Sequence, residues 1–278
     1  MSDVYHSIMG LPGSGKTTFL AALWHLINAG EVPTGLVLDR LVGEHHYLNK
    51  IVDAWQQCKE VPRTSIASET RVSIHVHETS SGRKSVLGFP DLSGESFEQQ
   101  LALRTCESSY VEDCNRDSGI LLFVTADRPL DGIAIVDVTP AIDAPGEASP
   151  AETREWTPDM VPQQVKVVEL LQFVQRPPFR HRRKRLSLAV SAWDVVRSSL
   201  SPTGWLEREM PLLYQFLRTN TASFEFNTYG ISAQGGDFRG DQRNDLLKLT
   251  PSERIVCVGP QGQSHDLSEP ILWLSSGD

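Results

Sequence analysis

The fold is decided near the start of the chain by residues 4–17, which read VYHSIMGLPGSGKT. The apolar residues 4–9 predict a short strand, and residues 10–17 match the pattern G-x-x-x-x-G-K-[ST] of a phosphate-binding loop. Residues 20–27 carry leucine and isoleucine at helical spacing and predict an amphipathic helix that ends near Gly30. Strand, loop and helix therefore follow one another in the order that the motif requires.

The residue types of this loop suit a polyphosphate. Glycine lets main-chain N–H groups curl around phosphate oxygens, Lys16 would reach the β and γ phosphates, and the Thr17 hydroxyl would bind Mg²⁺. A chance glycine turn between a strand and a helix is the alternative, and the order of the elements disfavours it. The residues expected to hold the nucleotide here are Gly10, Pro12, Gly13, Ser14, Gly15, Lys16, Thr17 and Thr18.

Length and composition favour one α/β domain with insertions. The 278 residues, 40% of them apolar, suffice for a substantial core, and we expect a single domain over 1–278 with an inserted helical segment at 36–62 and a loop insertion at 127–159. The net charge of −9 argues against a nucleic-acid backbone as the main partner. We expect a cytoplasmic protein, because the chain shows neither a signal peptide nor an apolar run of about 20 residues.

Apolar stretches and helical periodicity alternate along the rest of the chain. This alternation predicts a three-layer fold with a mostly parallel central sheet and helices on both faces. Strands are expected at residues 72–76, 86–90, 119–126, 186–190 and 224–229, and helices at 48–58, 160–174, 205–217 (broken near Pro211) and 270–274.

Asp91-Leu92-Ser93-Gly94 follows one of the expected strands. From this position Asp91 would hold Mg²⁺ through water, while the Gly94 N–H would meet the γ phosphate. An ordinary turn at the end of a strand is the alternative, since aspartate and glycine are common there.

A second motif, Ser191-Ala192-Trp193-Asp194, ends a later strand, where the crevice of a parallel sheet receives a base. The Asp194 carboxylate matches the N1–H and amino donors of guanine but would face an acceptor nitrogen of adenine. Trp193 would stack on the base, and Ser232, Ala233 and Gln234 would place a main-chain N–H against the guanine carbonyl oxygen. Alternatively, Asp194 caps the next helix and Trp193 packs in the core.

Together these motifs resemble those of the Ras-like GTPases, a TRAFAC-type group of P-loop proteins. The resemblance implies GTP or GDP and Mg²⁺ as ligands. Two motifs depart from the group's pattern. Its base-recognition motif is usually Asn-Lys-x-Asp, whereas this chain has Ser191-Ala192-Trp193-Asp194. The residue after Asp-x-x-Gly is usually a catalytic glutamine that orients water, whereas this chain has Glu95. We therefore expect slow hydrolysis.

More narrowly, the inserted helix, the Pro62-Arg63-Thr64 step and the closing Pro270-Ile271-Leu272-Trp273 look like the bacterial double-GTPase families of conflict and defence loci. This resemblance implies a molecular switch with a protein partner, either a second GTPase or an effector, in a defence or signalling system.

A GTPase also needs a threonine that closes over Mg²⁺ and the γ phosphate, and we choose Thr64, with Thr70 as the second candidate. Arg63 beside it is a candidate arginine finger, although an arginine in an exposed loop is more commonly just solvated. The basic run at 180–185 is interpreted as a solvated loop, and His75 and His77 as a solvent-facing pair on a strand.

Two other functions stay open on the sequence alone. A P-loop kinase or ATPase acting on a small acceptor would use the same loop, but it would leave Asp91 and Asp194 unexplained. A nucleotide-binding scaffold that does not hydrolyse its ligand would fit the replacement of glutamine by Glu95.

Overall fold

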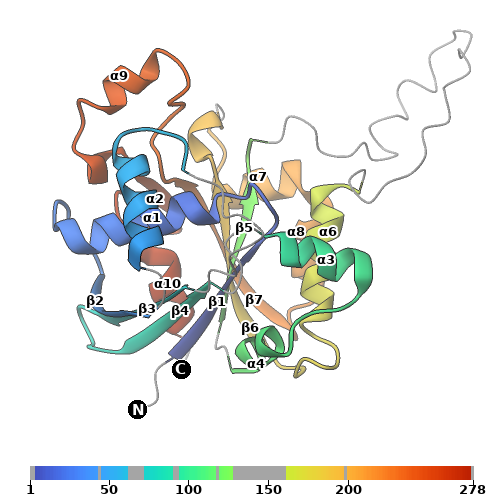
Figure 1. Cartoon of the computed structure of the whole chain (residues 1–278). Helices are drawn as coiled ribbons and strands as arrows, with labels where there is room; N and C mark the ends of the chain where they lie inside the picture. The colour runs from blue at the N-terminus through green and yellow to red at the C-terminus, as the bar shows by residue number, and fades with distance from the viewer. Residues whose placement is uncertain are drawn as a thin grey trace, which may run out of the picture.

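A nine-stranded sheet runs through the described part of the chain, in the order β2-β3-β4-β1-β5-β6-β7-β8-β9 (Figure 1). The computed structural model describes residues 4–42, 45–61, 72–89, 94–116, 119–127, 161–196 and 199–276. The strands are β1 (Val4–Gly10), β2 (Leu36–Val42), β3 (Val72–Glu78), β4 (Lys84–Phe89), β5 (Gly119–Thr125), β6 (Lys184–Ser191), β7 (Phe224–Ser232), β8 (Val256–Gly259) and β9 (Gly262–Ser264).

The centre of the sheet is parallel and both edges are antiparallel. Strands β4, β1, β5, β6 and β7 pair in parallel, which places their carboxyl ends at one edge of the sheet. On one side β3 and β2 continue the sheet antiparallel, and on the other side β8 and β9 do the same. The hairpin between β3 and β4 turns at Gly82, whose φ of 68° is left-handed. The mostly parallel sheet is the one that the sequence predicted.

Helices cover both faces of the sheet and complete three layers (Figure 1). One face carries α1 (Lys16–Ala29), α2 (His45–Gln56) and α10 (Glu269–Ser275), and the other carries α3 (Glu95–Leu103), α4 (Ser108–Arg116), α6 (Gln163–Phe173), α7 (Pro202–Glu209) and α8 (Pro211–Thr219). Successive residues of β5 point to opposite faces, so Leu121 and Phe123 pack in the first layer's core and Leu122 in the second's. Burial on both faces explains why this strand is apolar throughout.

Helix α1 follows its sequence pattern closely. Its buried side chains include Leu20, Leu23 and Leu26, and it ends at Gly30, which has a left-handed φ of 63°. The predicted break at Pro211 is confirmed, because α7 ends at Glu209 and α8 begins at the proline. None of the helices in the described ranges is long and apolar enough to cross a membrane.

The expected inserted segment at 36–62 begins with an edge strand, β2, and continues with α2, which packs on α1 and whose Leu48, Ile51 and Trp55 are fully buried in the core on this face of the sheet. Residues 128–159 of the expected loop insertion lie outside the described ranges. The domain boundaries given above therefore stay predictions.

Candidate functional site

The phosphate-binding loop joins the central strand β1 to α1. Two of its glycines are left-handed, Gly13 with a φ of 72° and Gly15 with a φ of 92°. A Cβ on Gly15 would lie 2.8 Å from the Cβ of Ser191, so only glycine lets the loop pack this closely against the end of β6. This contact brings the first residue of the expected base-recognition motif directly against the phosphate-binding loop.

Lys16 lies across this loop. Its side chain is only 2% exposed, and Nζ donates to the main-chain carbonyls of Gly10 at 2.6 Å and Leu11 at 3.1 Å. The ammonium group also lies 6.0 Å from the centre of the Phe97 ring. The positive charge is therefore held next to the N-terminus of α1, where helix geometry leaves main-chain N–H groups without partners inside the helix.

The hydroxyl groups of the loop suit a phosphate and a hard cation. Ser14 Oγ is buried and has no hydrogen-bond partner among the described residues, which is costly unless a ligand or water meets it. Thr17 and Thr18 are half-buried in the first turn of α1. A hydroxyl, a lysine and exposed main-chain amides at a helix start are the groups that bind a magnesium-bound polyphosphate.

Gly94 packs onto the loop from the side of α3. Its φ of 85° is left-handed, and a Cβ there would lie 2.6 Å from the main-chain nitrogen of Pro12 and 2.7 Å from both Leu11 C and Lys16 Nζ. Gly94, the last residue of the motif that begins at Asp91, thus lies directly against the phosphate-binding loop, as the γ-phosphate hypothesis requires. Residues 91–93 themselves lie outside the described ranges.

Glu95 is the first residue of α3 and is half-buried. Together with Glu98 it places negative charge in the first turn of the helix, where the helix dipole favours it. This structural role exists whether or not Glu95 orients water, and its catalytic role stays a prediction.

At the end of β6 the main chain turns sharply to present Asp194. Ala192 has a left-handed φ of 53°, which is strained for a residue with a Cβ. Asp194 accepts a hydrogen bond of 2.5 Å on Oδ1 from Ser232 Oγ, and Ser232 Oγ in turn accepts one from the Gly235 N–H at 3.1 Å. Oδ2 of Asp194 has no partner among the described residues. The two motifs that were proposed to read the base are thus joined by a hydrogen bond.

Trp193 packs on the protein in this structure. Three of its ring atoms lie 2.3 to 2.7 Å from where a Gly230 Cβ would be, and its ring meets Trp205 edge-on at 6.5 Å between centroids. This is the packing that the alternative interpretation expected. Stacking of Trp193 on a base stays a prediction.

Gln234 turns its side chain into the protein. Its Nε2 donates to the Trp55 carbonyl and to Cys58 Sγ, both at 3.4 Å, so a contact from Gln234 to a base must come from its main chain. Trp55 Nε1 donates to the Ala233 carbonyl at 2.9 Å. This contact could not be predicted from the sequence, in which Trp55 is only one of the apolar positions of an expected helix.

Some of the remaining candidate residues lie outside the described ranges, and others make contacts within the fold. Arg63, Thr64 and Thr70 lie outside the described ranges. The basic run is less solvated than expected: Lys184 is 2% exposed and donates to the Cys114 carbonyl at 2.9 Å, and Arg185 pairs with Glu225 at 3.4 Å. Among the described residues no three His, Cys, Asp or Glu side chains gather as a metal site.

Four segments therefore converge at the carboxyl edge of the parallel strands. The phosphate-binding loop follows β1, Gly94 lies beyond β4, the motif with Asp194 follows β6, and Ser232 ends β7. A crevice at this edge is where open parallel sheets bind their ligands.

The model of the Double-GTPase 1 family matches residues 7–274. No curated protein sequence matches the chain.

Similar solved structures include three GTP-related proteins. A bacterial selenocysteine-specific elongation factor, EF-Sec, is 13% identical with a TM-score of 0.38, over 90% of this chain and 29% of that one. Aquifex aeolicus Era, solved with GDP and AlF4⁻, is 14% identical with a TM-score of 0.33, over 90% and 58%. The GTP-bound GTPase-like domain of S. cerevisiae Ski7 is 13% identical with a TM-score of 0.45, over 84% and 43%. This chain thus spans less than two thirds of each of these three, and such remote likenesses carry no argument about function.

Proposed function

Since the chain belongs to the Double-GTPase 1 family, as the resemblance of its motifs predicted, we propose that it is a GTP-binding molecular switch with slow, Mg²⁺-dependent hydrolysis. Membership of a GTPase family supports GTP binding itself. The switching, the rate and the partner are the further content of the proposal.

One observation carries the proposal: the groups for phosphate and base lie at one edge of the sheet. Lys16 and Ser14 would bind phosphate oxygens, and Asp194, held by Ser232, would accept from guanine. A carboxylate at this position matches the N1–H and amino donors of guanine, whereas it would face the acceptor N1 of adenine, so Asp194 favours a guanine nucleotide.

The γ phosphate would act through Gly94. Because this residue lies against both the main chain and the lysine of the phosphate-binding loop, a change at the terminal phosphate would reach the start of α3 directly. Thr17, Asp91 and Thr64 are the residues that we propose hold Mg²⁺, which would neutralise the charge between the β and γ phosphates. Glu95 in place of glutamine supports slow turnover. Arg63 is proposed to stabilise the transition state of hydrolysis as an arginine finger.

We further propose a protein partner, either a second GTPase or an effector that reads the GTP-bound form, in a bacterial defence or signalling system in the cytoplasm. The basis is the family resemblance, together with the loops at Gly94 and Thr64 whose order would depend on the nucleotide.

The experiment is phosphate release from GTP and from ATP, with and without candidate acceptors, together with nucleotide binding. The proposal expects slow release from GTP without an acceptor and weak binding of ATP. Release that requires an acceptor would support a kinase, and tight GTP binding without any release would support a scaffold. Either result would overturn the switch as stated here.

A further inference from the structure

Trp55 of α2 reaches the segment that was proposed to read the base. Its side chain is fully buried, and its indole Nε1 donates to the Ala233 carbonyl at 2.9 Å. Peptide bonds between described residues are trans apart from Pro177-Pro178. In a planar trans peptide the C=O and N–H groups point in opposite directions. With the Ala233 carbonyl turned toward Trp55, the Gln234 N–H of the same peptide is turned away from the indole.

We propose that Trp55 is a positioning residue for base recognition: its indole N–H fixes the Ala233–Gln234 peptide so that the Gln234 N–H donates to the carbonyl oxygen of guanine. The inference rests on the proposed function, and it assigns a role in that function to the inserted helix α2.

Residues 232–235, the base-reading segment, are held by hydrogen bonds and by close main-chain packing. Ser232 Oγ bridges Asp194 and the Gly235 N–H. Gly235 is left-handed, with a φ of 88°, and a Cβ there would lie 2.5 Å from the Arg254 carbonyl oxygen. Only a glycine fits this approach. The hydrogen bond from the Trp55 indole fixes the Ala233–Gln234 peptide, which lies between Ser232 and Gly235. The Gln234 side chain in turn donates to the Trp55 carbonyl.

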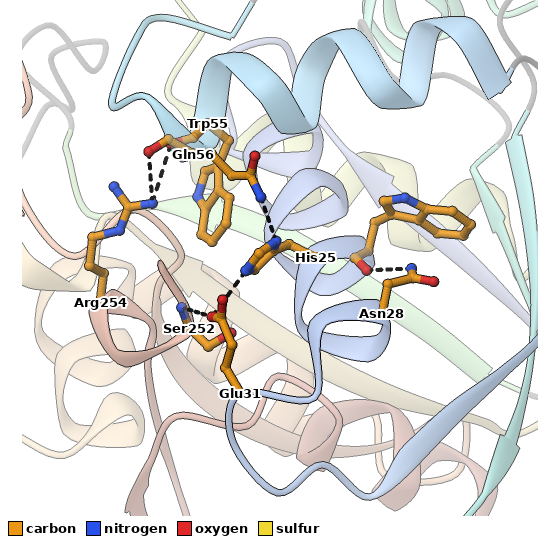
Figure 2. A network of polar contacts seen from close by, with 8 residues as sticks. His25, Asn28, Glu31, Trp55, Gln56, Ser252 and Arg254 are labelled. Atoms are coloured by element: carbon orange, nitrogen blue, oxygen red, sulfur yellow. Dashed lines mark hydrogen bonds and ion pairs between the residues drawn. The ribbon is translucent and has the colours of Figure 1, made fainter. Parts of the chain in front are cut away.

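The indole itself is held firmly. Figure 2 shows the Arg254 guanidinium beside the end of α2, where it donates to the Gln56 carbonyl at 3.3 Å and to the Trp55 carbonyl at 3.5 Å. The same guanidinium lies 4.9 Å from the Trp55 ring centre, and the His25 ring lies 5.2 Å from it. The cation near the ring and the second ring beside it restrict the orientation of the indole.

The same contacts tie the indole to α1, the helix that begins in the phosphate-binding loop. Gln56 Nε2 donates to His25 Nδ1 at 2.9 Å, which leaves the proton on His25 Nε2 to be donated to Glu31 at 3.1 Å (Figure 2). Glu31 accepts a further bond from the Ser252 N–H at 3.0 Å. Although burial raises the pKa of Glu31, these hydrogen bonds from Ser252 and His25 bring it below its ordinary value. Helix α1, which begins in the phosphate-binding loop, thus supports Trp55 through Gln56.

The test compares ligands that differ only at the guanine carbonyl. GTP and 6-thio-GTP share every donor, but sulfur is a poor acceptor. Trp55→Phe should weaken GTP binding by about three- to tenfold, the worth of one neutral hydrogen bond, and should leave the affinity for 6-thio-GTP nearly unchanged. Trp273→Phe is the matched control, because Trp273 packs against the same core and its indole N–H donates to the Asn227 side chain rather than to residues 232–235. It should leave both affinities unchanged.

Both affinities come from one preparation, so their ratio does not depend on the folded fraction. If Trp55→Phe does not fold, benzothienylalanine at position 55 replaces the indole N–H by sulfur at nearly the same shape, and the same change in ratio is expected. An equal loss for both ligands, or no loss, would overturn the inference. A wild-type protein that does not prefer GTP to ATP would instead contradict the proposed function, before any variant is made.

Discussion

Gly94→Ala is the perturbation that most directly tests the contact between α3 and the phosphate-binding loop. Ordinary contacts of a Cβ begin near 3.4 Å, whereas this Cβ would lie 2.6 Å from the Pro12 nitrogen and 2.7 Å from Leu11 C. Because both neighbours are main chain, the Gly94 segment must retreat by about 0.8 Å. A main-chain hydrogen bond of about 2.9 Å to the γ phosphate would stretch to about 3.7 Å, which is no longer a hydrogen bond.

The loss of one hydrogen bond to a charged group is worth about 1.5–3 kcal/mol, which corresponds to about 10- to 100-fold in Kd. We therefore expect Gly94→Ala to weaken GTP binding by that factor and GDP binding by less, since GDP has no γ phosphate. The assay is equilibrium titration of both nucleotides with Mg²⁺ present.

Gly30→Ala is the matched control. Gly30 is also left-handed, with a φ of 63°, but a Cβ there would meet nothing within 4 Å. Both variants should lose about 1–2 kcal/mol of folding free energy to backbone strain. Only Gly94→Ala should also bind GTP more weakly. Equal GTP affinities in the two variants, or equal losses for GTP and GDP in Gly94→Ala, would refute the reasoning.

Four further predictions use other residues. Lys16→Ala should abolish measurable nucleotide binding, and retained binding in a calorimetric titration would contradict this. Asp194→Asn should bring the affinities for GTP and ATP to within a few-fold of each other, because the amide places a donor against a guanine donor; an unchanged preference would argue against its role. Burial, and then the nearby Arg185, lower the pKa of His6 to about 4. The unfolded chain therefore takes up a proton first as pH falls below about 6.5, and stability is lost toward pH 4, by about 2 kcal/mol at pH 5. The free energy of unfolding, measured with urea at about pH 7.5 and about pH 5, should fall between these two pH values by about 2 kcal/mol less in His6→Gln than in the wild type. Equal decreases would contradict a buried neutral histidine. Arg63→Ala should slow single-turnover GTP hydrolysis by about 10³-fold if it is an arginine finger, and an unchanged rate would remove that role.

The sequence predicted the parts of the fold that depend on local chemistry. The phosphate-binding loop, the end of α1 at Gly30 and the break at Pro211 follow from residue types within a few positions of each other. The central strands follow from their apolar runs, because both faces of a parallel sheet are buried. Helices α3 and α4 were not predicted. Each has nine residues and few apolar positions, so tertiary packing decides their structure.

The candidate site was predictable as a set of motifs but not as a set of contacts. Asp194 follows β6 and Ser232 ends β7, and the rule for parallel sheets brings them to one edge. Their hydrogen bond, the approach of Gly235 to Arg254 and the donor from Trp55 join residues between 19 and 178 positions apart. No local pattern encodes such pairs, because they form only when elements far apart in the sequence pack together at the end of β7.

The central claim, a guanine nucleotide site built from the phosphate-binding loop and Asp194, is tested most directly by measuring the dissociation constants of GTP and ATP with Mg²⁺ on the unmodified chain. The account predicts that GTP binds at least about tenfold more tightly, a difference of about 1.4 kcal/mol or more. Equal affinities for the two nucleotides, or no binding of either, would contradict it.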